Sequence, residues 1–115
     1  MPKPTRPTHR LSRVAELIQR ELGNLLINEV NDLRLKKVTI SNVKMSPDLR
    51  HARISFTVLD EADAKYSAKA LNKAAHFFRK HIAKELELRV VPELFFVYDQ
   101  SLHEAEDLVN LINKL

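Results

Sequence analysis

The stretch from residue 86 to residue 101 constrains the fold of this 115-residue chain most strongly, because it joins a long helical pattern to the most apolar segment. Residues 94–98 form an unbroken apolar run, with Pro92 just before it and Asp99-Gln100-Ser101 just after it. A short apolar run between such boundaries is typical of a strand that is covered on both faces. We therefore predict that residues 94–98 form a central strand.

A helical pattern opens the chain. From Thr8, the predicted N-cap, apolar residues recur at the three-four spacing of an amphipathic helix as far as Val30, and Asn31-Asp32 closes the segment. Gly23, the only glycine, lies inside this pattern. Glycine costs about 1 kcal/mol relative to alanine inside a helix, so we expect it to weaken the helix without ending it.

Two strands follow. Residues 38–45 alternate between apolar and polar with one slip of phase, which predicts a strand with a bulge near Ser41-Asn42. The alternation is regular over residues 52–58, after the turn residues Ser46-Pro47-Asp48. These segments predict an antiparallel hairpin with one face in water.

A second helical pattern covers residues 60–86, with Asp60 as its N-cap. After the strand at 94–98, Ser101 and Glu104 have the spacing of a capping box that opens a final helix. The order of elements predicts an α+β fold, in which a three-stranded sheet has its helices mainly on one face. We expect one domain over residues 8–115, preceded by a flexible basic arm with three prolines over residues 1–7.

The composition narrows the classes of function. The chain has no cysteine, and neither a signal peptide nor a membrane-spanning segment can be recognised, so we expect a cytoplasmic protein without membrane contact. The net charge is +4, and the first 20 residues are basic whereas the last 17 are acidic. Such polarity favours one face that binds a polyanion.

One row of cations follows the second helical pattern at spacings of three and four residues, which places its members on one side of a helix. Like charges at this spacing repel each other, and phosphate oxygens would relieve that repulsion; a solvated lysine face is the simpler alternative. The members of the row are Lys65, Lys69, Lys73, His76, Lys80 and Lys84, with Arg79 beside them.

Other motifs carry little chemistry. Asp60-Glu61-Ala62-Asp63 spells a helicase motif, but no phosphate-binding loop accompanies it, so helix capping explains it better. The histidines show no metal-binding spacing, and the serines lack the context of a nucleophile. We therefore predict neither a metal site nor a cofactor nor an enzymatic activity.

Several blocks in order resemble the ribosome-binding factor A family, a bacterial family of assembly factors for the small ribosomal subunit. The strongest is Leu-Arg-Val-Val-Pro-Glu-Leu-Phe-Phe-Val-Tyr-Asp-Gln-Ser at residues 88–101, and residues 29–35, 43–49 and 52–59 support it. The resemblance implies a type II KH-like domain of order α-β-β-α-α-β plus a C-terminal helix, with a break in the long helix. The family places a glycine at that break, where this chain has Ala74-Ala75-His76.

The resemblance also implies a function. Members of the family bind the immature or free small (30S) subunit and its 16S ribosomal RNA, assist late maturation and rRNA processing, and matter for cold adaptation. We expect a monomer without a cofactor, and an assembly GTPase is a candidate further partner. Because the Gly-x-x-Gly loop of ordinary KH domains cannot be built here, phosphate recognition of folded RNA fits better than the recognition of successive bases.

The predicted RNA-binding residues combine this row with cations from elsewhere in the chain. They are Arg6, Arg10, Arg13, Lys36, Lys37, Lys69, Lys73, His76, Arg79, Lys80, Lys84 and Arg89. A hypothesis of another class is a non-catalytic adaptor whose last helix docks a protein partner through Leu108, Val109, Leu111 and Ile112.

Overall fold

The computed structural model describes residues 7–28, 35 and 37–114, with the backbone alone at 7–9 and 102–107. The elements in chain order are α1 (Pro7–Asn28), β1 (Val38–Met45), β2 (His51–Val58), the 3-10 turn η1 (Glu61–Asp63), α2 (Ala64–Lys73), α3 (Ala75–Leu86), β3 (Glu93–Tyr98) and α4 (Ser101–Asn113). The predicted order of helices and strands is confirmed. The sheet order is β1-β2-β3, with β1 antiparallel and β3 parallel to β2.

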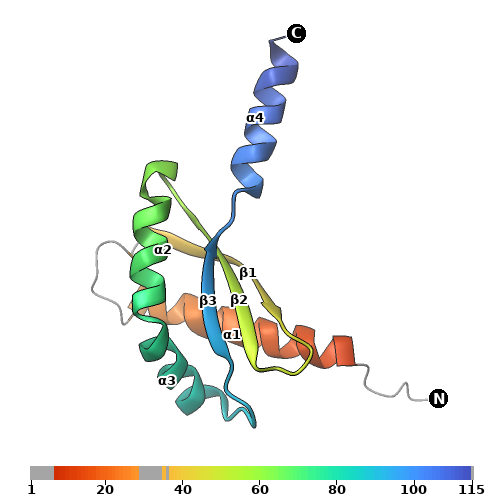
Figure 1. Cartoon of the computed structure of the whole chain (residues 1–115), viewed down its shortest axis with the longest axis vertical. Helices are drawn as coiled ribbons and strands as arrows, with labels where there is room; N and C mark the ends of the chain where they lie inside the picture. The colour runs from red at the N-terminus through yellow and green to blue at the C-terminus, as the bar shows by residue number, and fades with distance from the viewer. Residues whose placement is uncertain (1–6, 29–34, 36, 115) are drawn as a thin grey trace, which may run out of the picture.

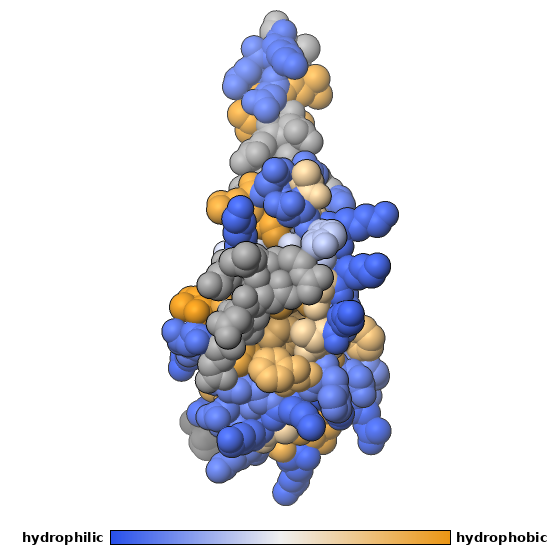
Figure 2. Space-filling model, turned by 90° about the vertical axis from the view of Figure 1, so that its left-hand side faces the viewer, coloured by the Kyte–Doolittle hydropathy of each residue, from blue (hydrophilic) through white to orange (hydrophobic). Residues whose placement is uncertain are grey.

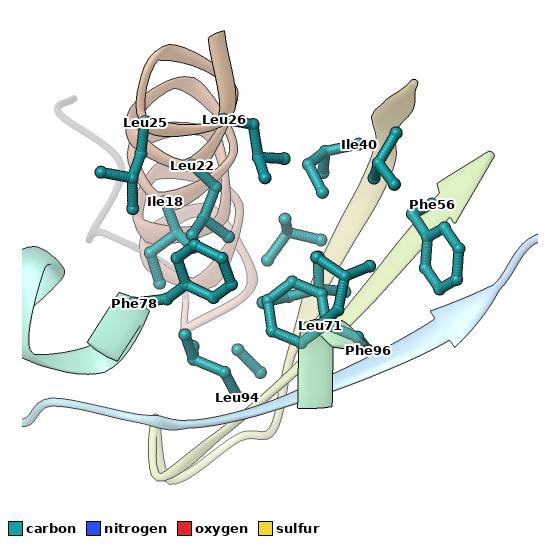
Figure 3. Close-up of a cluster of buried hydrophobic side chains, with 14 of the residues drawn as sticks. Ile18, Leu22, Leu25, Leu26, Ile40, Phe56, Leu71, Phe78, Leu94 and Phe96 are labelled. Atoms are coloured by element: carbon teal, nitrogen blue, oxygen red, sulfur yellow. The ribbon is translucent and has the colours of Figure 1, made fainter. Parts of the chain in front are cut away.

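The core lies between one face of the sheet and three helices (Figure 3). The apolar stripe of α1 contributes fully buried side chains such as Ile18 and Leu22, while Leu71 of α2 and Phe78 of α3 approach from the side of β3. The ring centroids of Phe78 and Phe96 are 5.5 Å apart, a tilted contact that joins α3 to β3. Figure 1 shows α1 behind the sheet, and none of the described helices lies in front of it.

The predicted bulge is confirmed. Ile40 pairs with Phe56 and Asn42 with Ser55, so Ser41 is the extra residue. Without this slip the inward residues of the second half of β1 would face water, because side chains alternate along a strand. The turn that follows is also as predicted. Asp48 accepts hydrogen bonds from the Ser46 hydroxyl (2.6 Å) and the Arg50 N–H (3.0 Å), and these bonds hold the pKa of its carboxyl below the ordinary value.

The first helix begins at Pro7, so the prediction of Thr8 as its N-cap is wrong. Proline suits the first helical position because its fixed φ is helical and its missing N–H would have no partner there. The helix continues through Gly23, as expected. The predicted end of this helix near Asn31-Asp32, and residues 1–6 of the predicted arm, lie outside the described residues.

The long helical pattern is two helices that meet at Ala74. Ala74 has φ −91° and ψ 3°, and its N–H still donates to the carbonyls of Ala70 and Leu71. Because φ is negative, the break needs no glycine: any L residue can adopt this conformation. The break implied by the family resemblance is thus present in this chain with alanine at the junction (Figure 1).

The third strand differs from the prediction. β3 is an edge strand, and its side chains alternate between buried Leu94 and Phe96 and exposed Phe95 and Val97, which are 50% and 36% exposed. The prediction of a central strand covered on both faces is therefore wrong. The apolar run led to a wrong prediction because the outward residues of β3 are apolar as well as the inward ones. None of the described helices covers these outward residues.

The outer edge of β3 is closed by a side chain. The Asn72 amide of α2 donates to the Phe96 carbonyl (3.0 Å) and accepts from the Phe96 N–H (3.0 Å), as a neighbouring strand would. It also donates to the Ala68 carbonyl (3.0 Å), which fixes its orientation on the helix. An unpaired edge is a template for unwanted strand pairing, and this side chain blocks it.

The last helix begins at Ser101 with Gln100 as its N-cap, so the predicted capping box with Ser101 as N-cap is wrong. Asp99 accepts from the Ser101 N–H (2.9 Å) and, through its other oxygen, from the hydroxyl of the bulge residue Ser41 (2.9 Å). Hydrogen bonds from the hydroxyl and the N–H of Ser101 and from Ser41 lower the pKa of the Asp99 carboxyl. Beyond this anchor, α4 projects away from the sheet (Figure 1). No helix in the described part of the chain is long and apolar enough to cross a membrane.

Replacing Asn72 with alanine removes both partners of the Phe96 peptide groups at the edge of β3. We expect Asn72→Ala to lower the free energy of unfolding by about 1–3 kcal/mol, the usual cost of leaving such groups unsatisfied. Urea unfolding followed by circular dichroism measures this. Lys73→Ala, at an exposed neighbouring position, is the control and should stay within about 0.5 kcal/mol of the parent. Equal midpoints for the two variants would show that Asn72 does not stabilise the edge.

Candidate nucleic-acid interface

The break at Ala74 divides the predicted row of cations into two short rows. Lys65, Lys69 and Lys73 lie on α2, and His76, Lys80 and Lys84 lie on α3; all six residues belong to these helices and line their outer sides. We call these the α2 row and the α3 row. Figure 2, which faces this side of the molecule, shows hydrophilic side chains standing out at the level of α2 and a broader hydrophilic surface below it. A bent double row can follow a curved or grooved polyanion better than a straight one.

The α2 row borders a hollow of about 200 Å³ whose described walls are Tyr66, Lys69, Ala70 and Lys73. Tyr66 is 62% exposed there, beside the stems of two lysines. The hollow therefore lies beside two lysines, whose ammonium groups can bind phosphate, and an aromatic ring, which can pack against a base or a sugar. Tyr66 is not among the RNA-binding residues predicted from the sequence. Its signal was the spacing to Lys69 and Lys73, three and seven residues on, which places it on the same side of the helix.

Arg79 has a different environment from the lysines around it. Its Nε and Nη2 donate to the carbonyls of Pro92 (3.3 Å) and Val91 (3.2 Å), and these bonds are partly buried. They join α3 to the segment just before β3 and hold the start of that strand. The structure therefore gives Arg79 a structural role, and its predicted contact with RNA stays a prediction.

The remaining predicted cations are spread around the domain. Arg10 and Arg13 are exposed near the start of α1. Figure 1 shows that this end of the helix projects past one lateral edge of the sheet, whereas α2 and α3 lie at the other edge. The helix is 22 residues long, which corresponds to about 33 Å at 1.5 Å per residue. These two arginines thus form a separate group and do not extend either row.

The sheet register places two further exposed cations at opposite ends of the domain. Lys37 precedes Val38, which pairs with Val58 just before α2 begins, so Lys37 lies at the same end as the start of the α2 row. Arg89 lies between α3 and β3, at the end of the sheet where β3 begins beside His51. Arg6 and Lys36 lie outside the described residues.

α3 is held in place from α1 by a polar contact. His81 Nε2 and Glu21 Oε1 are 2.8 Å apart, and both side chains are largely buried. This contact lies between the helices, on a different side of α3 from the cations of its row. The α3 row is therefore presented on a helix that is fixed by Arg79 on one side and by His81 on another.

Comparison with known proteins agrees with this fold. The family model described as ribosome-binding factor A matches residues 10–112. A curated relative, ribosome-binding factor A of Nitrosococcus oceani, is 46% identical over 106 residues, which cover 91% of this chain and 84% of the relative.

Two solved structures are similar in fold. The crystal structure of ribosome-binding factor A from Thermus thermophilus has a TM-score of 0.69 and 22% identity, and the match covers 76% of this chain and 94% of that one. A Thermus thermophilus homology model fitted into the cryo-EM map of a 30S-RBFA complex has a TM-score of 0.57 and 22% identity over 73% and 93% of the two chains. Together with the element order and the sheet topology, these likenesses confirm the predicted KH-like fold.

Arg79 and Lys80 are adjacent, and replacing either by glutamine removes one positive charge. We expect Arg79→Gln to lower the free energy of unfolding by about 1 kcal/mol, the usual net contribution of a hydrogen bond, because these bonds are only partly buried. Lys80→Gln should change it by less than about 0.5 kcal/mol. Urea unfolding of both variants measures the difference. If the two variants unfold alike, the bonds to the 91–92 carbonyls do not contribute to stability.

Proposed function

Because this chain belongs to the ribosome-binding factor A family, we propose that it binds the free or immature small ribosomal subunit through its ribosomal RNA. In this role it assists late maturation of the subunit and rRNA processing, with its greatest importance in the cold. The protein acts as a cytoplasmic monomer, and the role requires neither a cofactor nor catalysis. An assembly GTPase is the proposed further partner.

The two rows on α2 and α3 are the observation that carries this proposal. The folded helices already place these cations along one surface, and counterions released from the RNA supply the favourable free energy of binding. The rows place positive charge on the helices that cover β3. The hollow lined by Tyr66, Lys69 and Lys73 offers room for a base, a sugar or a phosphate of the RNA. The complex named for the Thermus relative supports the small subunit as the partner.

Phosphate contact predicts a steep dependence on salt. Each lysine that neutralises a phosphate adds about 0.7–0.9 to the slope of log affinity against log salt concentration. We expect Lys69→Gln/Lys73→Gln to lower that slope by roughly 1.5 and to weaken binding to free small subunits at low salt. Co-sedimentation with free small subunits and with whole ribosomes, at a series of salt concentrations, measures both quantities.

Arg20→Gln/Lys114→Gln is the matched control, since it removes the same charge from two exposed positions outside both rows. It should leave the slope nearly unchanged. An equal fall for both variants would mean that only net charge matters, and a flat salt response of the parent protein would contradict phosphate binding.

A second candidate function rests on α4. Leu108, Val109, Leu111 and Ile112 are each more than half exposed, on a helix that projects from the domain (Figure 1). Exposed apolar side chains gathered on one helix are typical of a surface that docks a protein. The adaptor hypothesis therefore keeps one specific observation in its favour.

A variant of α4, compared with the variant of the α2 row, distinguishes the two functions. Leu108→Gln/Ile112→Gln changes exposed side chains one turn apart, so we expect stability to change by less than about 0.5 kcal/mol. If RNA binding through α2 and α3 is the main function, co-sedimentation with the small subunit is unchanged. Loss of co-sedimentation in this variant, with Lys69→Gln/Lys73→Gln unaffected, would favour the adaptor.

A further inference from the structure

The uncovered face of the sheet is a second surface with its own chemistry. Its outward residues on β1 and β2 are polar or charged, as expected for a face in water. On β3, however, Phe95 and Val97 point outward, and half of the Phe95 side chain is exposed. A half-exposed phenylalanine ring on a mostly polar face calls for an explanation.

The register gives this ring cationic neighbours. Lys44 of β1 pairs with Arg53 of β2, and Arg53 pairs with Phe95 of β3, so the three side chains form one row across the whole sheet. Adjacent strands are about 4.8 Å apart, so the row spans about 10 Å. Two residues before Arg53 on β2, the His51 ring lies 5.8 Å from the Phe95 ring, centroid to centroid, at an interplanar angle of 31°.

The rest of the face supplies hydrogen-bonding groups and two carboxylates, Glu93 and Asp99; Asp99 continues the ladder past Tyr98 and accepts a hydrogen bond from the Ser41 hydroxyl. Asn42 pairs with Ser55, and Ser55 with Val97, in the next outward row. Glu93 pairs with His51 at the margin of the sheet. A protein-docking surface is expected to have a broad apolar centre, whereas the apolar residues of this face are Phe95 and Val97 on one edge strand, among cations and polar groups. Ring, cation and hydrogen-bonding groups together are the set that binds unpaired nucleotides.

We propose that this face binds an unpaired base of RNA, which stacks on Phe95 while Arg53 and Lys44 neutralise the adjoining phosphates. The inference rests on the proposed function, since it assumes an RNA partner, and it adds a contact of a different kind. The rows on α2 and α3 recognise phosphate irrespective of pairing, whereas stacking on Phe95 requires a base that is free of its helix.

The chain has no tryptophan, so Phe95→Trp introduces a single reporter at the proposed stacking position. We expect its fluorescence to be quenched by a mixed-sequence single-stranded RNA decamer and much less by the same decamer in a duplex. Phe77→Trp, at another exposed phenylalanine, on α3, is the matched control and reports RNA at the cation rows. Quenching of the Phe77→Trp variant alone, or equal quenching by duplex and single strand, overturns the proposal.

Affinity provides the second measurement. Phe95→Ala should weaken binding of the single-stranded decamer by about 5- to 100-fold, the range expected when a stacking aromatic is truncated. Phe95→Tyr keeps an aromatic ring and should bind like the parent protein. Phe95→Leu keeps an apolar side chain without a ring and should behave like Phe95→Ala. Because Phe95 is exposed, all three variants should unfold close to the parent protein, which thermal unfolding checks.

The same variants separate this proposal from the proposed function. If the Phe95→Trp variant co-sediments with small subunits but neither the subunit nor the decamer quenches it, the stacking proposal fails and ribosome binding stands. If the parent protein fails to bind subunits and decamer alike, both fail. If Phe95→Ala abolishes self-association or protein binding and leaves RNA affinity unchanged, the face is a protein interface and the proposal is overturned.

Discussion

The arrangement of the cation rows on α2 and α3 depends on the two hydrogen bonds between the Asn72 amide and the Phe96 peptide groups. β3 is joined to the sheet on one side only, by parallel pairing with β2, and its other edge must be closed. Asn72 closes it from α2, the Phe78 ring packs on Phe96 from α3, and Arg79 holds the carbonyls that lead into the strand. The two helices are thereby fixed to β3 by their inner sides, and their lysines are left on the outer sides.

The break at Ala74 makes these contacts compatible. A straight helix over residues 64–86 would extend about 35 Å, far longer than the six residues of β3, which span about 20 Å. By bending at Ala74, the chain keeps Asn72 and Arg79 on opposite sides of the junction and both within reach of β3 and the segment before it. The same bend divides the cations into two rows. The proposed RNA-binding surface is in this sense a consequence of how a long amphipathic pattern covers a short strand.

Features that depend on local periodicity could be predicted from the sequence. The bulge at Ser41 and the turn at Asp48 follow from neighbouring residues, and the structure has them. The predicted caps at Thr8 and Ser101 were wrong, because each residue lies inside its helix. What depends on distant partners could not be predicted at all. An apolar run cannot reveal that Phe95 faces water, since burial is decided by which elements cover the strand. Similarly, Arg79 resembles its lysine neighbours in the pattern, and only the fold brings the carbonyls before β3 to its guanidinium. The spacing of Tyr66 places it on the side of Lys69 and Lys73, but the hollow that the three residues line is visible only in the fold.

The two proposed contact surfaces would select a particular state of the RNA. Phosphate contact alone does not require an unpaired base, so the rows on α2 and α3 would give strength without selecting unpaired RNA. A base stacked on Phe95 must first leave its own helix, at a cost of a few kcal/mol when it is paired and less when it is already free. Because that cost is lowest where pairing is incomplete, a protein with both surfaces would bind an unfinished RNA structure more tightly than a finished one. Under the two proposals, completion of the RNA helix would itself weaken the complex, and release would follow from maturation.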